Sequence, residues 1–476
     1  MPDRLEDRLV KAPAIRAARV ALGGRDGAWI VGGAVRDALL DRDVTDVDLV
    51  VDGDAREVAR AVARAAPGHP FALSGEFAMW RVQSRDEPWH VDVAPLRGDS
   101  IEADLGERDF TINAIALPLG GGEPADPHAG AADIERRVLR AVGERSFEDD
   151  PLRILRAARI ATALKLEIDP ETIELARRSA ERAAEPAGER QFAELRGIVA
   201  GPDPLRGLTL MDELGATPVV LPELEALRGV EQNPYHHLDV HGHTLEVLRR
   251  VVEVERDLHR LLGDPAPDVE ELLAEPLADE LTRRGGLRLA ALFHDLGKPE
   301  TRRVAEDGRI LFIGHDQAGA RIIRGICARL RASRRLTTYL QSLTLNHLRL
   351  GFLVHERPLS RRRVYEYLKA TEPETVDVTL LTIADRLATQ GPRTRAEAID
   401  AHLELARKMV AEGLSWRRFG PPQPLVRGDE LAAELGIEPG PELGRALGEI
   451  EAAQFAGEVR TRDEAVALAR RALSVD

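Results

Sequence analysis

The spacing of apolar residues predicts a mixed N-terminal region followed by a long helical one. Residues 29–31 form a short apolar run, Gly32 and Gly33 allow a tight turn, and residues 34–40 have helical spacing. Residues 46–51 then alternate between apolar and polar side chains, as in a strand with one buried face. This stretch therefore predicts a strand, a turn, a helix and a second strand in succession.

The same spacing predicts the elements that follow. Residues 55–66 are expected to form a helix, and residues 79–82 and 90–93 are expected to form strands. From a helix at 148–161 onward the pattern is helical, and the acidic, proline-bearing stretch 263–280 is expected to be an exposed loop inside the helical region.

Two carboxylates, Asp46 and Asp48, lie on the polar face of the second strand. Side by side they repel unless a cation compensates them, and oxygen ligands of this kind suit magnesium. Asp92, in a later strand, either joins the pair as a third carboxylate or is a strand-edge acid in water. The glycine turn and the helix start after it, with Arg36 close by, form an anion site suited to phosphate. The first unit thus offers a phosphate cradle and a metal site.

Composition restricts the partners and the compartment. The chain has 476 residues, enough for about three domains, and a formal net charge of −15. That charge is unexpected for a nucleic-acid binder, so RNA binding must rely on local clusters of arginine. The single cysteine, Cys327, excludes an internal disulfide, and no apolar run is long enough to span a bilayer. We therefore expect a cytoplasmic protein with no membrane partner.

The motif GGAVRD, followed by DVD, resembles the signature of the class II nucleotidyltransferase superfamily, which contains the tRNA CCA-adding enzymes and the bacterial poly(A) polymerases. The stretch ERDFTINA, which starts at Glu107, resembles a second motif of that family, usually RRDFTINA. The resemblance implies that Arg108 neutralises the triphosphate, while Asp109 and Asn113 hold the ribose and the local backbone. Glu107 replaces the usual first arginine, which slightly weakens phosphate binding there.

The stretch EDDPLRILRAARIA resembles the base-reading motif of the same family. Arg153, Arg156 and Arg159 recur every three residues and share a helix face. Cytosine and adenine both present an exocyclic amine beside a ring-nitrogen acceptor, which a carboxylate such as Asp150 and a guanidinium such as Arg153 complement. The pair would leave UTP and GTP with mismatched hydrogen-bonding groups, so we expect the protein to select C and A without an RNA template.

A second set of residues resembles the HD phosphohydrolase superfamily, in which adjacent His and Asp combine with His and Asp from other helices. Imidazole and carboxylate ligands suit a transition metal such as manganese, nickel or iron, and water bound to it is activated for attack on a phosphoester. The candidate ligands are His243, His294, Asp295, His315, His347 and Asp385.

The two resemblances imply an α+β fold in which a polymerase beta-like, mixed α/β head precedes all-α neck, HD and tail domains. The expected boundaries are 1–24 for a helical lead-in, 25–145 for the nucleotidyltransferase head, 146–228 for the neck that binds nucleotide and RNA, 229–415 for the HD domain and 425–476 for the helical tail.

The resemblance further implies a template-independent tRNA nucleotidyltransferase that adds CCA to the tRNA 3′ end from CTP and ATP by a two-metal mechanism. Asp46, Asp48 and Asp92 would be catalytic, with magnesium on the first two. The nucleotide-binding residues would be Gly32, Gly33, Arg36, Arg108, Asp109, Asn113, Asp150, Arg153, Arg156 and Arg159.

Three alternatives stay open. Only fifteen residues separate Asp92 from Arg108, whereas enzymes of the family that add all three nucleotides usually carry a longer flexible loop here. Addition of CC alone, with a separate A-adding enzyme as partner, is therefore one alternative. A bacterial poly(A) polymerase shares the early motifs and is the second. An HD-type metal-dependent phosphohydrolase with an RNA-binding head is the third.

Overall fold

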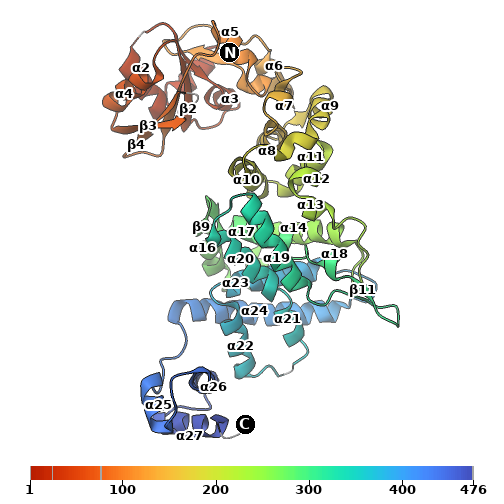
Figure 1. Cartoon of the computed structure of the whole chain (residues 1–476). Helices are drawn as coiled ribbons and strands as arrows, with labels where there is room; N and C mark the ends of the chain where they lie inside the picture. Colours follow the sequence, from red (N-terminus) through yellow and green to blue (C-terminus); the bar gives the residue numbers. More distant parts are fainter. Residues whose placement is uncertain (1, 24, 75–77, 357, 474–476) are drawn as a thin grey trace. The chain divides into compact units, whose positions relative to one another are not determined.

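The computed structural model describes residues 2–23, 25–74, 78–356 and 358–473. The chain separates into two compact units, Met1–Val220 and Leu221–Asp476. The first contains a six-stranded sheet, and the second is almost entirely helical (Figure 1). The α+β class expected from the sequence, a mixed head followed by helical regions, is confirmed.

A mixed sheet forms the centre of the N-terminal unit, with the strand order β3-β4-β5-β2-β1-β6. Neighbouring strands run antiparallel except β2 and β5, which are parallel. The strands are β1 (Ala28–Val31), β2 (Asp46–Val51), β3 (Gly68–Ser74), β4 (Met79–Ser84), β5 (His90–Pro95) and β6 (Ala116–Pro118). The four strands predicted from the sequence are confirmed as β1, β2, β4 and β5.

Helices cover both faces of this sheet. The helices α2 (Pro13–Leu22) and α4 (Ala55–Ala65) pack against each other and against the strands on one face. The helix α5 (Ile101–Gly106) covers the other face, where it packs with Val31 and Val50. Because alternate residues of a strand point to opposite faces, Asp48 of β2 lies on the same face as Val50 and α5.

Gly130 begins α6 (Gly130–Arg136) at a place where two backbone segments come very close. A Cβ on this residue would lie 2.1 Å from the carbonyl oxygen of Thr111, which cannot rotate away as a side chain could. We expect Gly130→Ala to lower the free energy of unfolding by about 1–3 kcal/mol, the usual cost of overpacking. Thermal unfolding measures this beside Gly120→Ala, whose methyl group would meet no described atom within 4 Å. Equal melting temperatures for the two variants would contradict the prediction.

The helix predicted at 148–161 is interrupted in the structure. The helix α7 (Ser146–Asp149) ends before Asp150, and α8 (Arg153–Leu164) begins three residues later. Asp150 has an extended backbone, with φ −143° and ψ 97°, because the following Pro151 disfavours the helical conformation of the residue before it. The remaining helices of this unit are α1 (Pro2–Leu9), α3 (Gly33–Leu39), α9 (Pro170–Arg178), α10 (Gly188–Val199), α11 (Pro204–Glu213) and α12 (Thr217–Val220).

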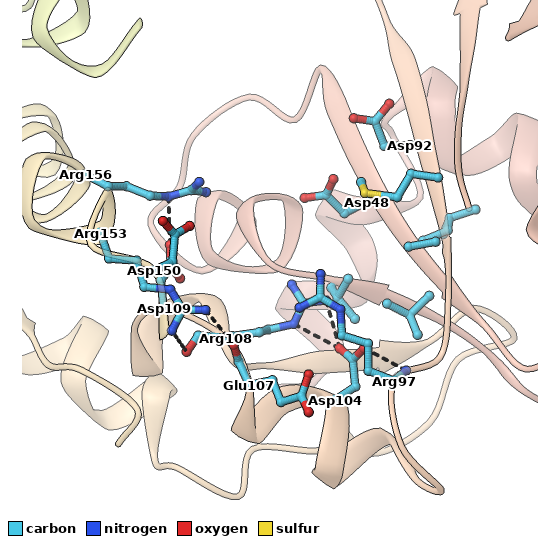
Figure 2. A pocket seen from close by; sticks show the side chains of 15 residues that line it. Asp48, Asp92, Arg97, Asp104, Glu107, Arg108, Asp109, Asp150, Arg153 and Arg156 are labelled. Atoms are coloured by element: carbon cyan, nitrogen blue, oxygen red, sulfur yellow. Dashed lines mark hydrogen bonds and ion pairs between the residues drawn. The ribbon is translucent and has the colours of Figure 1, made fainter. Parts of the chain in front are cut away.

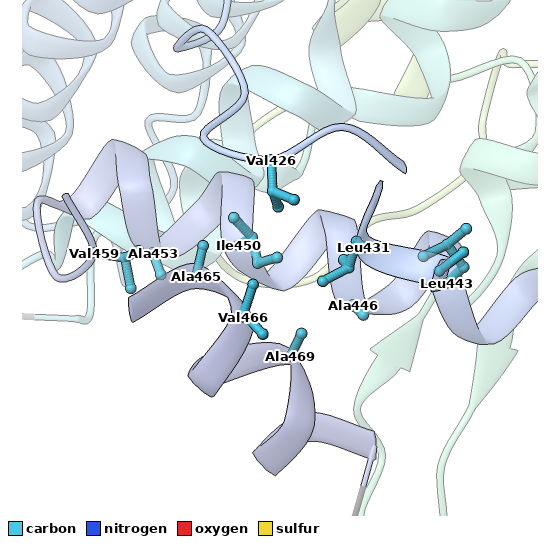
Figure 3. Close-up of a cluster of buried hydrophobic side chains, with 11 residues drawn as sticks. Val426, Leu431, Leu443, Ala446, Ile450, Ala453, Val459, Ala465, Val466 and Ala469 are labelled. Atoms are coloured by element: carbon cyan, nitrogen blue, oxygen red, sulfur yellow. The ribbon is translucent and has the colours of Figure 1, made fainter. Parts of the chain in front are cut away.

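The C-terminal unit begins with a bundle of long helices and ends in a small helical tail. The long helices are α14 (Val240–Arg256), α17 (Arg283–Phe293), α19 (His315–Arg329), α20 (Arg334–Asn346), α23 (Thr375–Ala388) and α24 (Ala396–Phe419). The tail helices are α25 (Gly428–Leu435), α26 (Pro441–Ala456) and α27 (Arg462–Leu473). They enclose an apolar cluster of their own, which includes Leu431, Ile450 and Val466 (Figure 3).

The stretch 263–280 differs from its prediction as an exposed loop. It contains the helix α16 (Ala266–Ala274), whose Val269, Leu272 and Leu273 are buried. These residues have the spacing of one apolar helix face, which the surrounding acids and prolines obscured in the sequence. In the part of the chain that the structure describes, every helix is too short or too polar to cross a bilayer.

Candidate active site

Strand pairing places two carboxylates side by side in the N-terminal unit. Asp48 of β2 is the register partner of Asp92 on the parallel strand β5, so the two side chains share a sheet face. Both line a cavity of about 290 Å³ (Figure 2). Desolvation in this cavity and the charge of Asp92 raise the pKa of Asp48, while Arg108 and Arg156 oppose the rise. A divalent cation would relieve this repulsion, so the donor set fits magnesium.

Asp46, the other carboxylate predicted on β2, lies at the start of this strand and is largely exposed. Its Oδ1 lies 2.9 Å from Nδ1 of His90, and it is outside the lining of the cavity in Figure 2. Asp92 is held by a fork from Arg81, with two hydrogen bonds of 2.7 Å each. The sequence analysis missed both partners, because only the strand register places His90 beside Asp46 and Arg81 beside Asp92.

The glycine turn lets two charged side chains reach the backbone between β1 and α3. Gly32 has a φ of +67°, a conformation that favours glycine. A Cβ at this residue would lie 3.1 Å from Nη1 of Arg108 and 3.2 Å from Oδ2 of Asp48. The glycine is therefore required by both the backbone conformation and the space around it.

A second cavity, of about 320 Å³, opens at this turn. Arg36 of α3 lines it, donates from Nη1 to Oδ1 of Asn113 at 2.7 Å, and pairs with Asp37 through Nε and Nη2. Asp37 and Asn113 line it as well. Four residues line both this cavity and the first one: Asp48, Arg108, Asp109 and Arg156. The predicted nucleotide-binding residues thus surround two adjacent cavities on either side of these four.

Arg108 is held in place by a buried acid that the sequence analysis did not single out. Asp104 of α5 accepts hydrogen bonds from Nε and Nη2 of Arg108, at 3.2 Å and 3.0 Å. Its other oxygen accepts from the backbone nitrogen of Arg97 at 3.2 Å. Asp104 lies four residues before Arg108, so the helical spacing of the pair was the signal that could have revealed it.

Asp109 is buried and fully engaged. Burial alone would raise the pKa of its carboxyl, but Arg156, Asn113 and the backbone of Phe110 together hold that pKa below its usual value. Nε of Arg156 lies 2.7 Å from Oδ2 of Asp109, and Asn113 donates to Oδ1 at 2.9 Å. The carboxylate therefore fixes Arg156 and Asn113, which face the cavities. This positioning role is additional to its predicted contact with the ribose.

The two base-reading candidates lie on the α8 side of the first cavity (Figure 2). Arg153 donates to the backbone oxygens of Glu107 and Arg108, at 2.7 Å and 3.2 Å. Asp150 accepts a hydrogen bond from Arg190 of α10 at 2.9 Å. Arg190 was missed because it comes from a separate helix. Arg159, the third arginine of the motif, lines only the second of the two cavities and pairs with Glu194.

The six candidate ligands of the C-terminal unit lie together around Asp295, at the end of α17. Oδ2 of Asp295 lies 3.1 Å from Nε2 of His294 and 3.6 Å from Nε2 of His243. Its Oδ1 lies 3.5 Å from Nε2 of His315 and 4.0 Å from Nε2 of His347. These atoms form two groups that share Asp295. Asp385 completes the first group, with Oδ1 at 3.1 Å from Nε2 of His243.

The protonation of this cluster suits a metal. Nδ1 of His294, His315 and His347 each lies 2.6–2.9 Å from the carbonyl oxygen three residues earlier. This contact occupies Nδ1 and directs Nε2 toward Asp295, where a bound metal would replace the proton that Asp295 otherwise favours on His294. Within the described residues, Nε2 of His243 and His294 and both oxygens of Asp295 are buried without a well-formed hydrogen bond. Buried ligand atoms left in this way fit a bound cation.

Lys298 is the charged neighbour of the cluster that the sequence analysis did not assign. Its Nζ lies 2.6 Å from Oδ2 of Asp295. Burial alone would raise the pKa of Asp295, but His294 and Lys298 hold that pKa well below the usual range. The carboxylate is therefore ionised, as a metal ligand must be.

Comparisons with known proteins match family models to parts of both units. A model of the poly A polymerase head domain matches residues 28–140, a model of the probable RNA- and SrmB-binding site of polymerase A matches 165–227, and an HD domain model matches 240–390. These matches and the paired carboxylates define a nucleotidyltransferase head joined in one chain to an HD domain.

Relatives of known activity extend over nearly the whole chain. An A-adding tRNA nucleotidyltransferase of Deinococcus radiodurans is 36% identical, over 94% of this chain and 95% of its own length. A CC-adding tRNA nucleotidyltransferase of Thermus thermophilus is 33% identical, over 92% of each. A structure of the Thermotoga maritima CCA-adding enzyme with tRNA shares the fold, with a TM-score of 0.62 and 22% identity over 99% of this chain and 98% of that one. The chain belongs to the tRNA nucleotidyltransferase family.

Proposed function

We propose that this chain adds nucleotides to the 3′ end of tRNA, from CTP and ATP and without a nucleic-acid template. The observation that carries the proposal is the cavity of Figure 2, where Asp48 and Asp92 share one space with Arg108, Arg153 and Arg156. Related structures bear the names of CCA-adding enzymes with tRNA, CTP or ATP. A cytoplasmic location fits these substrates.

In this reaction an oxygen of the terminal ribose bonds to the α-phosphorus of the incoming nucleotide, the bond to pyrophosphate breaks, and the hydroxyl proton goes to solvent. Asp46 and Asp48, with Asp92 beside them, would hold magnesium, which stabilises charge on the attacking and leaving oxygens when it is bound. Arg36 and Arg108 would bind the triphosphate, because guanidinium groups form charge-assisted hydrogen bonds with phosphate oxygens.

Base selection is proposed for Asp150 and Arg153. We expect Asp150→Ala to lower the preference for CTP over UTP, and for ATP over GTP, by about tenfold or more, because a pocket acceptor for the exocyclic amine is lost. Single-nucleotide incorporation into a tRNA transcript with each of the four triphosphates measures this preference. Asp149→Ala is the control, since Asp149 is exposed, pairs with Arg145 and lies outside the lining of the cavity. Unchanged preferences in Asp150→Ala would contradict the assignment.

Addition of CCA is proposed, with addition of CC alone as the alternative. Only residues 96–100 connect β5 to α5, where enzymes that add all three nucleotides usually carry a longer loop. The relatives include CC-adding and A-adding enzymes. Under the alternative, a separate A-adding enzyme would complete the end.

The deciding experiment supplies purified protein, magnesium and labelled nucleotides to tRNA transcripts that end before CCA, after C and after CC. Completion of CCA supports the proposal, and extension by CC that stops before A establishes the alternative. Addition of A only to ends that already carry CC assigns the A-adding activity. Long A tracts identify a poly(A) polymerase, and no incorporation at all refutes nucleotide addition.

A second activity, hydrolysis of phosphoesters, is proposed for the C-terminal unit. The observation that favours it is the group of buried ligand atoms around Asp295 that lack a well-formed hydrogen bond among the described residues. The head and HD families both imply dependence on divalent metals, and the imidazole-rich donor set here favours manganese, nickel or iron. Such a metal, when bound, lowers the pKa of water so that it attacks phosphorus at neutral pH.

A further inference from the structure

A cavity of about 180 Å³ adjoins the ligand cluster of the C-terminal unit. Two of the six cluster residues, His347 and Asp385, line it. His347 belongs to the group at Oδ1 of Asp295, whereas Asp385 belongs with His243 on the other side. A ligand in this cavity would therefore meet both halves of the cluster at once.

Two polar side chains, each with a buried nitrogen that lacks a hydrogen bond within the described residues, form another part of the wall. Arg386 follows Asp385 on α23, and His402 comes from α24. His402 is only 4% exposed, and its Nε2 makes no hydrogen bond to any described residue. Nε of Arg386 is also buried without a hydrogen bond there. Leaving such groups unpaired costs stability, so their presence at a cavity points to a ligand.

The two side chains offer different chemistry. Arg386 supplies a positive charge that, within the described chain, has no carboxylate at ion-pair distance, whereas the buried Arg288 pairs with Glu255 at 2.6 Å. Burial and the charge of Arg386 lower the pKa of His402 to about 4. Its ring is therefore neutral at neutral pH. Because the ring also hydrogen-bonds to the backbone of Thr382, the unpaired Nε2 is left to accept a hydrogen bond, which suits a hydroxyl group better than an anion.

We infer that this cavity is the substrate pocket of the metal cluster and takes a phosphate ester of a sugar, with Arg386 on the phosphate oxygens and His402 on a hydroxyl of the sugar. The inference rests on the metal centre proposed above and adds the residues that choose its substrate. It is independent of nucleotide addition, which uses residues of the other unit.

Calorimetric titration of the full-length, manganese-loaded protein tests each half of this inference. The two probes are inorganic phosphate and ribose 5-phosphate, and bound manganese is measured in every sample. We expect Arg386→Gln to weaken the binding of both probes by about 10- to 100-fold, because a charge-assisted hydrogen bond is lost. Arg386→Lys should recover part of the loss. We expect His402→Phe, which keeps an aromatic ring but removes both nitrogens, to weaken the binding of ribose 5-phosphate by about fivefold or more and to leave the binding of inorganic phosphate unchanged.

Arg393→Gln is the matched control, because Arg393 is exposed, close in sequence and outside the lining of the cavity. If Arg386→Gln still binds manganese and its affinity for phosphate is unchanged, the proposed substrate pocket is wrong and the proposed metal centre is not affected. If His402→Phe weakens the binding of both probes equally, the proposed role of His402 in binding a sugar hydroxyl is wrong. A wild-type protein that binds no manganese would overturn the metal centre and the pocket together.

Discussion

Replacing Asp48 with asparagine should lower the rate of nucleotide addition to tRNA by about 100-fold or more. The carboxylate is a predicted magnesium ligand at the centre of both cavities, and metal stabilisation of transition-state charge contributes several kcal/mol, at 1.4 kcal/mol per tenfold in rate. The measurement is kcat/KM for CTP with a labelled tRNA transcript at fixed magnesium. Activity within a few-fold of the wild type would rule Asp48 out as a metal ligand.

This loss should not come from unfolding. The pKa of Asp48 is raised in the folded protein, by desolvation and by Asp92, so above its unfolded pKa the ionised carboxylate opposes folding. A neutral asparagine removes that opposition, and the melting temperature of Asp48→Asn should equal or exceed that of the wild type at pH 7. Asp52→Asn, just beyond the end of the same strand and exposed, is the control that should leave both activity and stability unchanged.

Removing metal from the C-terminal unit should lower its melting temperature by about 8–16 °C. A ligand that is present at 1,000 times its Kd stabilises the folded state by about 4 kcal/mol, and each kcal/mol shifts the melting temperature of a unit of this size by about 2–4 °C. Differential scanning calorimetry before and after dialysis against a chelator measures the shift, and elemental analysis gives the metal content.

Two variants separate the cluster from non-specific metal binding. Asp295→Asn alters the residue that both ligand groups share, so its preparation should contain little metal and its melting temperature should not respond to the chelator. Asp307→Asn changes an exposed acid that pairs with Arg309 elsewhere in the same unit, and it should behave as the wild type does. A wild-type melting temperature that the chelator leaves unchanged would exclude a structural metal here.

Alternation revealed the strands that have one clearly buried face, and it missed β3, which lacks one, and β6, which has only three residues. In β2 the polar and apolar positions follow a two-residue period, so the faces of Asp48 and Leu49 were predictable. The strand β3 pairs only with β4 at the edge of the sheet, carries Pro70, and exposes Phe71 and Leu73. Its sequence lacks the pattern of a half-buried strand and includes the residue that edge strands tolerate.

Motifs located the chemical groups of the site, whereas their partners depended on tertiary packing. Arg81 and Arg190 hold Asp92 and Asp150 from a neighbouring strand and a separate helix, and no local spacing connects them to those acids. Lys298 was accessible to sequence reasoning, because it lies three residues after Asp295. The pocket residue His402 was not, since it reaches the cavity from a different helix.

The contact between Asp104 and Arg108 also has a consequence for the entropy of substrate binding. A free arginine side chain loses about 2 kcal/mol of rotamer entropy when it is fixed. Asp104 already fixes Nε and Nη2 of Arg108, while Nη1 faces the turn at Gly32. That ordering occurs once, when the chain folds, and is not repeated in each catalytic cycle. In the role proposed for Arg108, each incoming triphosphate would therefore meet an arginine whose direction is already set, and each departing pyrophosphate would leave it in place for the next.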